Sequence, residues 1–156
     1  MSDDVLFQKA KAYAFLLLKF RLRSEKEIVE RLKKKKFAPE VIDQTVSFLK
    51  SKSFIDDGLF AKAWVDSRLK KPFGLNRVVR ELRIKGITEE IIQGQVNCFK
   101  EDYPEKEIVF ALAKERSKRF KGVEPQKARQ RLYGYLLRRG FSVDTVIDAI
   151  DKLDKK

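Results

Sequence analysis

The sequence contains no histidine among its 156 residues. Without an imidazole group, the chain cannot build a Ser-His or Cys-His nucleophile pair, a histidine general base or a zinc site that includes histidine. The only cysteine is Cys98, which excludes an intrachain disulfide framework. Because Cys98 lies among the apolar positions Val96 and Phe99 of a predicted helix, we expect a small core residue rather than a reactive thiol.

Long apolar runs are also missing. The longest one, residues 12–18, has seven residues, whereas a helix needs about 20 apolar residues to cross a bilayer. The first four residues, Met1 to Asp4, are acidic where a secretory signal would be basic, and no small-residue cleavage site follows. We therefore expect a cytoplasmic protein that does not bind a membrane.

Helix-breaking residues are few, with four prolines and seven glycines, while Lys, Leu, Glu, Arg and Ala are abundant. This composition favours helices, and a hydrophobic content of 43% is enough for a packed core. The net charge of +13 indicates a polyanion such as nucleic acid, or an acidic protein surface, as the partner. The alternative is that the charge only keeps the surface soluble.

An apolar pattern with offsets of 0, 5, 10, 14 and 17 residues occurs three times, with shifts of 50 and then 54 residues. Its positions are Leu32, Phe37, Ile42, Val46 and Leu49; Leu82, Ile87, Ile92, Val96 and Phe99; and Leu136, Phe141, Val146, Ile150 and Leu153. The pattern predicts an all-α fold of three tandem three-helix repeats, residues 1–55, 56–100 and 101–156. We expect these repeats to form an elongated, curved array.

Turn and cap residues support this division. Ser24 and Glu27 have the spacing of a capping box, in which each side chain binds the other residue's backbone N–H. Gly86 and Gly140 follow the second helix of their repeats, where a left-handed residue closes the helix. The first repeat has Lys36 at this position, and a left-handed lysine costs about 1 kcal/mol relative to glycine.

The segment 56–87 is the most informative part of the chain. Asp56 or Asp57 can cap a helix that presents Phe60, Ala63 and Trp64 on one face. The two aspartates could instead bind a cation or act as a carboxylate pair, but no third ligand is apparent, so we favour capping. Likewise, Trp64 could stack on a nucleobase, but its spacing from Phe60 favours a place in the core.

Basic residues gather at the ends of the first helices and in the second helices, whereas the third helices are acidic. Taken individually, each basic residue could be an ordinary solvated charge. Together they can neutralise phosphates or pair with carboxylates, and stacked repeats would align them in a positive stripe. The binding candidates are Arg68, Lys70, Lys71, Arg77, Arg80, Lys85, Arg138 and Arg139. The last two could also stabilise the C-terminal end of a helix.

No arrangement typical of an enzyme accompanies these residues. The sequence has no glycine-rich phosphate loop followed by Lys-Ser or Lys-Thr. We therefore expect no catalytic residue, no bound metal and no cofactor.

Four segments resemble one protein family. They read L-x-x-R-x-R-S-x-x-E-I-x-x-x-L at residues 18–32, D-D-x-x-F-A-x-x-W-V-x-x-R at 56–68, G-x-x-x-V-x-x-E-L-x-x-K-G-I at 74–87 and L-R-R-G-F-S at 137–142. Together and in this order they resemble the RecX family, bacterial regulators of the recombinase RecA.

The resemblance implies that the protein binds the RecA filament on DNA, lies along its helical groove and modulates filament assembly, ATPase activity and strand exchange, usually by inhibition. The implied partners are the RecA filament and the single-stranded DNA within or beside it, and we expect a monomer. Two alternatives stay open. One is a helical-repeat protein that binds DNA without RecA, and the other is a scaffold for a different acidic protein.

Overall fold

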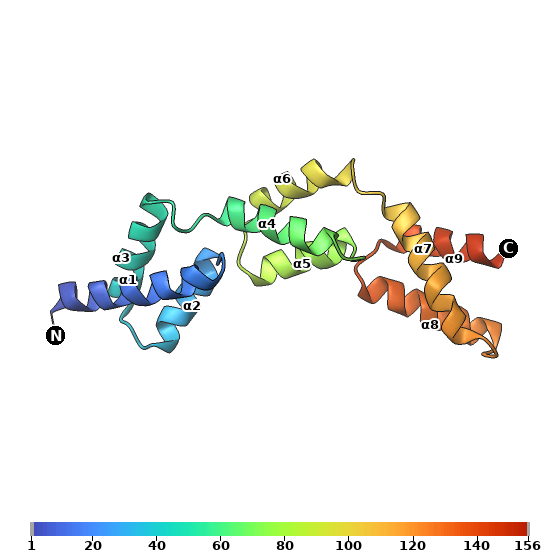
Figure 1. The fold of residues 1–156 in the computed structure, drawn as a ribbon, viewed down its shortest axis with the longest axis horizontal. Coiled ribbons are helices and arrows are strands. Elements are labelled where there is room, and N and C mark those ends of the chain that lie inside the picture. The colour runs from blue at the N-terminus through green and yellow to red at the C-terminus, as the bar shows by residue number, and fades with distance from the viewer. Residues whose placement is uncertain (1, 156) are drawn as a thin grey trace. The chain divides into compact units, whose positions relative to one another are not determined.

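The predicted all-α fold is confirmed in the computed structural model, which describes residues 2–155 (Figure 1). Over this range the chain forms nine α-helices and one short 3-10 helix, and it contains no strand. The elements are α1 (Asp3–Phe20), α2 (Glu25–Lys34), α3 (Pro39–Ser51), α4 (Asp57–Leu69), α5 (Leu75–Ile84), α6 (Glu89–Lys100), α7 (Glu105–Ser117), η1 (Lys118–Phe120), α8 (Pro125–Arg138) and α9 (Val143–Asp154). Within residues 2–155, no helix has both the length and the apolar character needed to cross a membrane.

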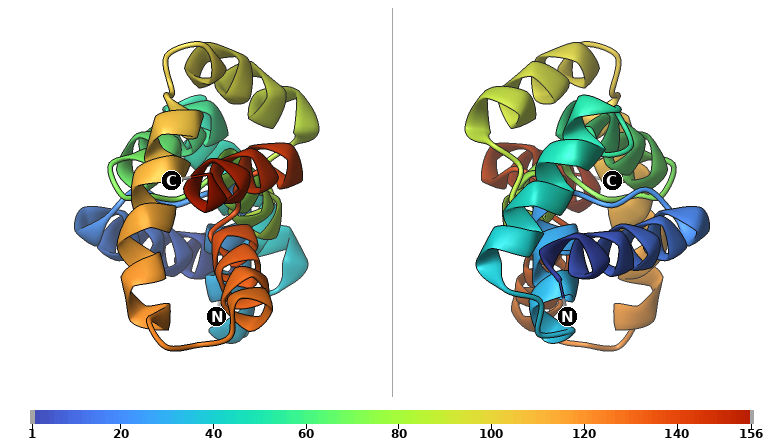
Figure 2. Two further views of the ribbon diagram at one scale, coloured as in Figure 1. Left: turned by 90° about the vertical axis from the view of Figure 1, so that its right-hand side faces the viewer. Right: turned by 90° about the vertical axis from the view of Figure 1, so that its left-hand side faces the viewer.

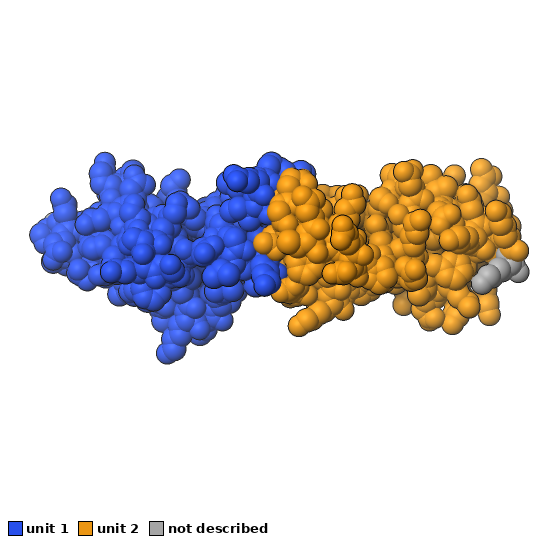
Figure 3. Space-filling view, turned by 90° about the horizontal axis from the view of Figure 1, so that it is seen from above, with its two compact units in different colours: residues 1–63, 82–92 blue, residues 64–81, 93–156 orange. Residues whose placement is uncertain are grey.

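The helices are distributed over two compact units (Figure 3). Unit 1 comprises residues 1–63 and 82–92, and unit 2 comprises residues 64–81 and 93–156. Each of α4, α5 and α6 contributes residues to both units. The chain therefore folds as three helix triplets, the middle one of which is shared.

The core of unit 1 lies among α1, α2 and α3, with α1 and α3 crossing each other (Figure 2). Ala10 and Ala14 of α1 are fully buried, and such small side chains let neighbouring helices come close. The larger core side chains are Leu17, Ile28, Leu32, Val41, Ile42, Val46, Leu49 and Ile55.

The core of unit 2 lies among α7, α8 and α9 and is built in a similar way. Ala113 of α7 is fully buried, as are Leu136 of α8 and Val146 of α9. Phe141, between α8 and α9, is the largest fully buried side chain in this core.

The threefold apolar pattern is confirmed position by position. Eleven of its fifteen residues are buried, and the remaining four are partly buried: Phe37, Val96, Phe99 and Leu153. None of the fifteen is exposed. The periodicity in the sequence therefore identifies the inward side of the second and third helices in every repeat.

The predicted turns are confirmed as well. Gly86 and Gly140 have φ angles of 81° and 92°, and Lys36 takes the same left-handed conformation with a φ of 66°. The capping box is complete, since the Ser24 side chain accepts from the Glu27 N–H and the Glu27 carboxylate accepts from the Ser24 N–H.

Two predicted core positions are wrong. Ala63 is exposed, because the buried side of α4 contains Phe60, Ala61 and Val65 and Ala63 points away from it, while Trp64 is half-buried. Cys98 is also exposed. It lies six residues, and hence about 240° around the helix, from the buried Ile92.

Candidate functional site

Three candidate arginines surround one aromatic ring in unit 2. The guanidinium carbons of Arg77, Arg139 and Arg68 lie 4.0, 5.0 and 5.3 Å from the centre of the Phe73 ring. Phe73 itself is buried in the turn between α4 and α5. Cations at these distances are attracted by the π electrons of the ring. We call Arg68, Arg77 and Arg139 the arginine cluster.

Backbone contacts bring these distant residues together. The Gly74 N–H donates to the Arg139 carbonyl at 2.8 Å, and the Asn76 N–H donates to the Gly140 carbonyl at 3.1 Å. Neither glycine has room for a side chain. A Cβ on Gly74 would lie 2.2 Å from the Gly140 oxygen, and one on Gly140 would lie 2.3 Å from the Arg77 Cβ. The start of α5 therefore docks directly on the turn between α8 and α9.

Glu81 of α5 orients two members of the cluster. It accepts from Arg68 Nε at 2.7 Å and from Arg77 Nε at 3.3 Å. Arg139 instead donates from Nε to the Tyr135 hydroxyl at 3.2 Å. The three guanidinium groups and one carboxylate together have a charge of +2, on side chains that are already held in place.

Sequence reasoning missed the aromatic groups that organise this cluster. Arg116 of α7 lies over the Tyr135 ring at 4.3 Å, and Arg139 lies over the same ring at 5.4 Å. The Tyr103 hydroxyl donates to the Phe73 carbonyl. Burial and the neighbouring Glu105 raise the pKa of Tyr103 to about 12, so this donor keeps its proton at neutral pH. No local sequence signal connects these residues to one another.

The other candidates of unit 2 lie at the surface. Lys70 and Lys71 occupy the turn after α4, Arg80 is on α5 and Arg138 ends α8. All four are exposed, and within residues 2–155 none of them forms an ion pair. Their charges are therefore available to a partner.

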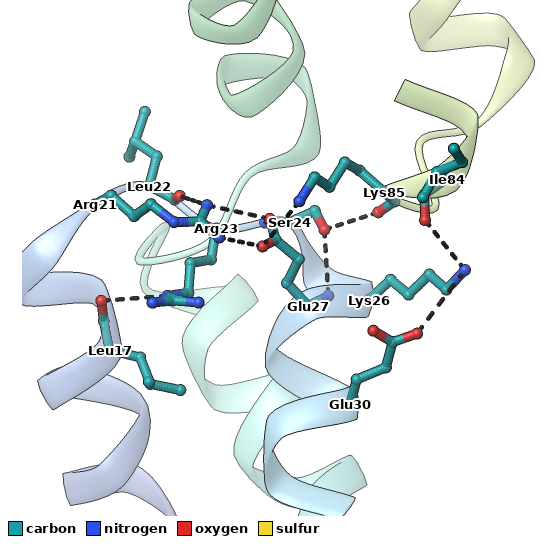
Figure 4. A network of polar contacts seen from close by, with 10 residues as sticks. All are labelled: Leu17, Arg21, Leu22, Arg23, Ser24, Lys26, Glu27, Glu30, Ile84 and Lys85. Atoms are coloured by element: carbon teal, nitrogen blue, oxygen red, sulfur yellow. Dashed lines mark hydrogen bonds and ion pairs between the residues drawn. The ribbon is translucent and has the colours of Figure 1, made fainter. Parts of the chain in front are cut away.

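Lys85 belongs to unit 1, where it is part of a polar network at the start of α2 (Figure 4). Its Nζ lies 3.5 Å from Glu27 Oε2, and its carbonyl accepts from the Ser24 hydroxyl at 2.7 Å. Lys26 Nζ donates to the neighbouring Ile84 carbonyl at 3.2 Å. Lys85 therefore helps to fasten the turn between α5 and α6 to α2.

Glu27 is the acidic centre of this network. Partial burial acts to raise its pKa, but the hydrogen bonds from Arg21 and from the Ser24 N–H, together with the charges of Arg21 and Lys85, outweigh that effect. The pKa of Glu27 therefore lies below its ordinary value of 4.5. The charged carboxylate stabilises the junction between α2 and the turn that contains Lys85.

Asp56 and Asp57, at the start of α4, both accept hydrogen bonds from backbone N–H groups. Asp56 Oδ1 accepts from the Leu59 N–H at 3.1 Å, which confirms the predicted helix cap. Asp57 Oδ1 accepts from the Glu25 N–H at 2.9 Å and thereby connects α4 to the start of α2. Both carboxylates have structural roles in unit 1.

Three family models match successive parts of the chain. They describe the first, second and third three-helix domains of RecX and match residues 10–49, 56–94 and 105–150, respectively. The matched ranges contain Arg68, Arg77 and Arg139.

Curated relatives and solved structures agree with these matches. A regulatory protein RecX from Chlorobium phaeobacteroides is 35% identical, covering 97% of this chain and 96% of its own. Those from Clostridium beijerinckii and Bacillus licheniformis are 30% and 33% identical over 98% and 97% of this chain, which spans 72% and 57% of their lengths. The crystal structure of RecX from Lactobacillus salivarius shares the fold, with a TM-score of 0.82 and 21% identity over 98% of this chain and 99% of its own. The chain belongs to the RecX family of regulatory proteins.

Proposed function

We propose that this protein binds the RecA filament on DNA and inhibits filament assembly, ATPase activity and strand exchange. Membership of the RecX family supports a regulatory role. The observation that carries the proposal is the arginine cluster, in which three guanidinium groups surround Phe73 and are only partly neutralised by Glu81.

The geometry of this cluster suits an anionic partner. A guanidinium group can donate two parallel hydrogen bonds to a phosphate or a carboxylate. The contacts with Phe73, Glu81 and Tyr135 hold the three side chains in place before binding, so less side-chain entropy is lost on binding. Guanidinium donors not used in these contacts can then face the DNA backbone or acidic side chains of RecA.

The proposed contact residues also include four exposed basic residues that are close in sequence to the arginine cluster: Lys70, Lys71, Arg80 and Arg138. Each adds a modest, salt-dependent attraction, and several weak contacts to a repeating polymer multiply in their effect. Lys85 contributes positive charge in unit 1 while it remains bound to Glu27. The proposed set is Arg68, Lys70, Lys71, Arg77, Arg80, Lys85, Arg138 and Arg139.

The direct test measures RecA ATPase activity and filament length on single-stranded DNA, with and without this protein. We expect lower ATPase activity and shorter filaments in its presence. We also expect the protein to act as a monomer, because a net charge of +13 opposes self-association. Unchanged ATPase activity and filament length at saturating protein would refute the proposal.

The second candidate function is sequence-independent DNA binding without RecA, and the charge of +13 favours it. Its signature would be affinity for bare DNA that falls steeply with salt and that RecA does not change. The proposed RecA-dependent function instead requires tighter binding to RecA-coated DNA than to bare DNA at the same salt concentration.

A further inference from the structure

Exposed apolar side chains are concentrated in unit 1. Within residues 2–155, ten large hydrophobic residues are exposed, and eight of them belong to unit 1. The other two, Val143 and Ile147, lie on α9 in unit 2. The eight are Val5, Phe15, Leu16, Phe20, Leu22, Phe54, Leu59 and Ile84. An apolar surface of this kind marks a site of interaction.

Several of these residues share one side of α1. Val5, Ala12, Leu16 and Phe20 are exposed and recur at helical spacing, so they line a single strip. The opposite side of the helix, with Ala10, Ala14 and Leu17, is buried in the core of unit 1. Leu16 is 53% exposed and Phe20 is 75% exposed. Helix α1 therefore presents large apolar side chains on a second, exposed side in addition to the side that packs in the core.

Aromatic rings widen this surface. Phe15 packs edge to face against Phe54, with ring centres 4.9 Å apart, and against Phe48 at 6.4 Å. Phe48 also packs against Phe7 at 6.1 Å, and Lys11 Nζ lies 4.4 Å from the centre of the Phe48 ring. Phe15 lies one turn after Ala12 on α1 and contacts Phe54, which follows α3. It therefore connects the strip on α1 to Phe54. We call Val5, Ala12, Phe15, Leu16, Phe20 and Phe54 the outer face.

We infer that the outer face docks on the protein component of the RecA filament. The surface of RecA that it contacts would be an apolar ridge bordered by carboxylates. This inference rests on the proposed function. Along α1, Lys9 and Lys19 lie among the apolar residues of the outer face, and Lys11 lies beside Phe15. A partner with apolar side chains opposite Leu16 and Phe20 and carboxylates opposite these lysines would complement both the apolar surface and its charge.

Other occupants fit less well. Nucleobases stack on flat rings, and Phe20 offers one exposed ring, but Val5 and Leu16 are aliphatic and Phe15 and Phe54 already pack against each other. A second copy of the chain would bring two charges of +13 together.

The inference divides recognition between the two units. The arginine cluster of unit 2 offers hydrogen bonds and charge to anionic groups, while the outer face of unit 1 offers apolar area to a protein. RecA-coated DNA contains both a protein and a polyanion, whereas bare DNA has no protein surface. Loss of the outer face should therefore weaken binding to RecA-coated DNA and leave binding to bare DNA unchanged.

The test compares two double variants of the full-length protein. Leu16→Ser with Phe20→Ser removes the most exposed apolar groups of the outer face, and Val143→Ser with Ile147→Ser makes the same kind of change on α9. Because all four side chains are exposed, both variants should keep the helicity and thermal midpoint of the wild type. We expect the first variant to bind RecA-coated single-stranded DNA at least about tenfold more weakly and the second to bind like wild type.

The outcomes separate the inference from the proposed function. Wild-type affinity of the Leu16→Ser/Phe20→Ser variant for RecA-coated DNA would overturn the inference alone. A loss of its affinity for bare single-stranded DNA would assign the outer face to nucleobases and would also overturn it, as would a wild-type dimer in sedimentation that this variant converts to monomer. A wild-type protein that does not bind RecA-coated DNA would refute the proposed function, and the inference with it.

Discussion

At the scale of single residues, Phe73 shows how one buried ring can organise distant charges. Its π electrons attract the guanidinium groups of Arg68, Arg77 and Arg139, which would otherwise repel one another. Glu81 offsets part of the repulsion by binding two of them. The three arginines are therefore held close together while retaining a net positive charge for a partner.

Glu27 permits a pH test at the same scale. Because its pKa in the folded protein is lower than its ordinary value of 4.5, its stabilising contribution is fully present above pH 4.5 and is lost as the pH falls through the lowered value. We expect Glu27→Gln to lower the thermal midpoint at pH 7 and to reduce the loss of stability below pH 4.5. Thermal unfolding followed by circular dichroism from pH 7 to about pH 3 measures both effects.

Glu30→Gln is the matched control, because Glu30 is more exposed and lies 3.9 Å from Lys26 in a surface pair. Such pairs contribute little to stability, so this variant should follow the wild-type pH profile. If Glu27→Gln also followed the wild-type profile, the charged Glu27 carboxylate would not stabilise the network as we infer.

At the scale of elements, both junctions between successive repeats use the same contact. The turn between α5 and α6 packs on the start of α2, where a Cβ on Gly86 would lie 2.6 Å from the Lys26 Cβ. The turn between α8 and α9 packs on the start of α5, where Gly140 meets Arg77. In each case a left-handed glycine leaves room for the second helix of the preceding repeat.

Gly140→Ala tests this contact. The substitution places a Cβ 2.3 Å from the Arg77 Cβ, at a φ of 92°. The strain and the clash should lower the free energy of unfolding by about 2 kcal/mol or more. It should also weaken binding to RecA-coated DNA, because Arg77 and Arg139 are displaced. Denaturant unfolding and binding anisotropy measure the two effects.

Gly94→Ala provides the control within α6. Its added Cβ would meet no atom within 4 Å, and alanine stabilises a helix interior by about 0.5–1 kcal/mol relative to glycine. A Gly140→Ala variant as stable as wild type would contradict the close packing at this junction.

At the scale of the whole molecule, the question is whether binding depends on total charge or on where that charge lies. Acidic groups are not absent, but the basic residues exceed them by 13. Several of the acidic groups form ion pairs, for example Asp151 and Asp154 with Arg129. The basic excess therefore resides in side chains such as Lys70, Lys71, Arg80 and Arg138.

Arg80→Glu with Arg138→Glu tests the role of location. Both residues are exposed and without an ion pair within residues 2–155, so the fold should be unaffected. We expect affinity for RecA-coated DNA to fall by about tenfold or more at low salt, and by less at high salt. Filament binding measured at two salt concentrations, with circular dichroism for helicity, provides the comparison.

The control with the same change in net charge is Lys33→Glu with Lys34→Glu, two exposed positions of α2. It should weaken binding less if the position of the charge matters. Equal losses in the two variants would indicate that the protein is attracted by its net charge and would remove Arg80 and Arg138 from the proposed site.

The sequence by itself determined the helices, their caps and the threefold repeat. These features follow local rules, since helical periodicity and capping act between residues at most a few positions apart. For this reason the left-handed turns at Lys36, Gly86 and Gly140 and the inward positions of the apolar pattern could be predicted. The same local motifs were sufficient to suggest the RecX family, which the family models confirm.

Only the tertiary structure decided which basic residues come together. Arg77 and Arg139 are far apart in the chain and meet because two glycines let their backbones approach. Lys85 instead pairs with Glu27 within unit 1, apart from the arginine cluster of unit 2. It also decided that Cys98 is exposed and that α1 has a second apolar side. Such contacts depend on how helices pack across long sequence separations, and local spacing carries no information about that packing.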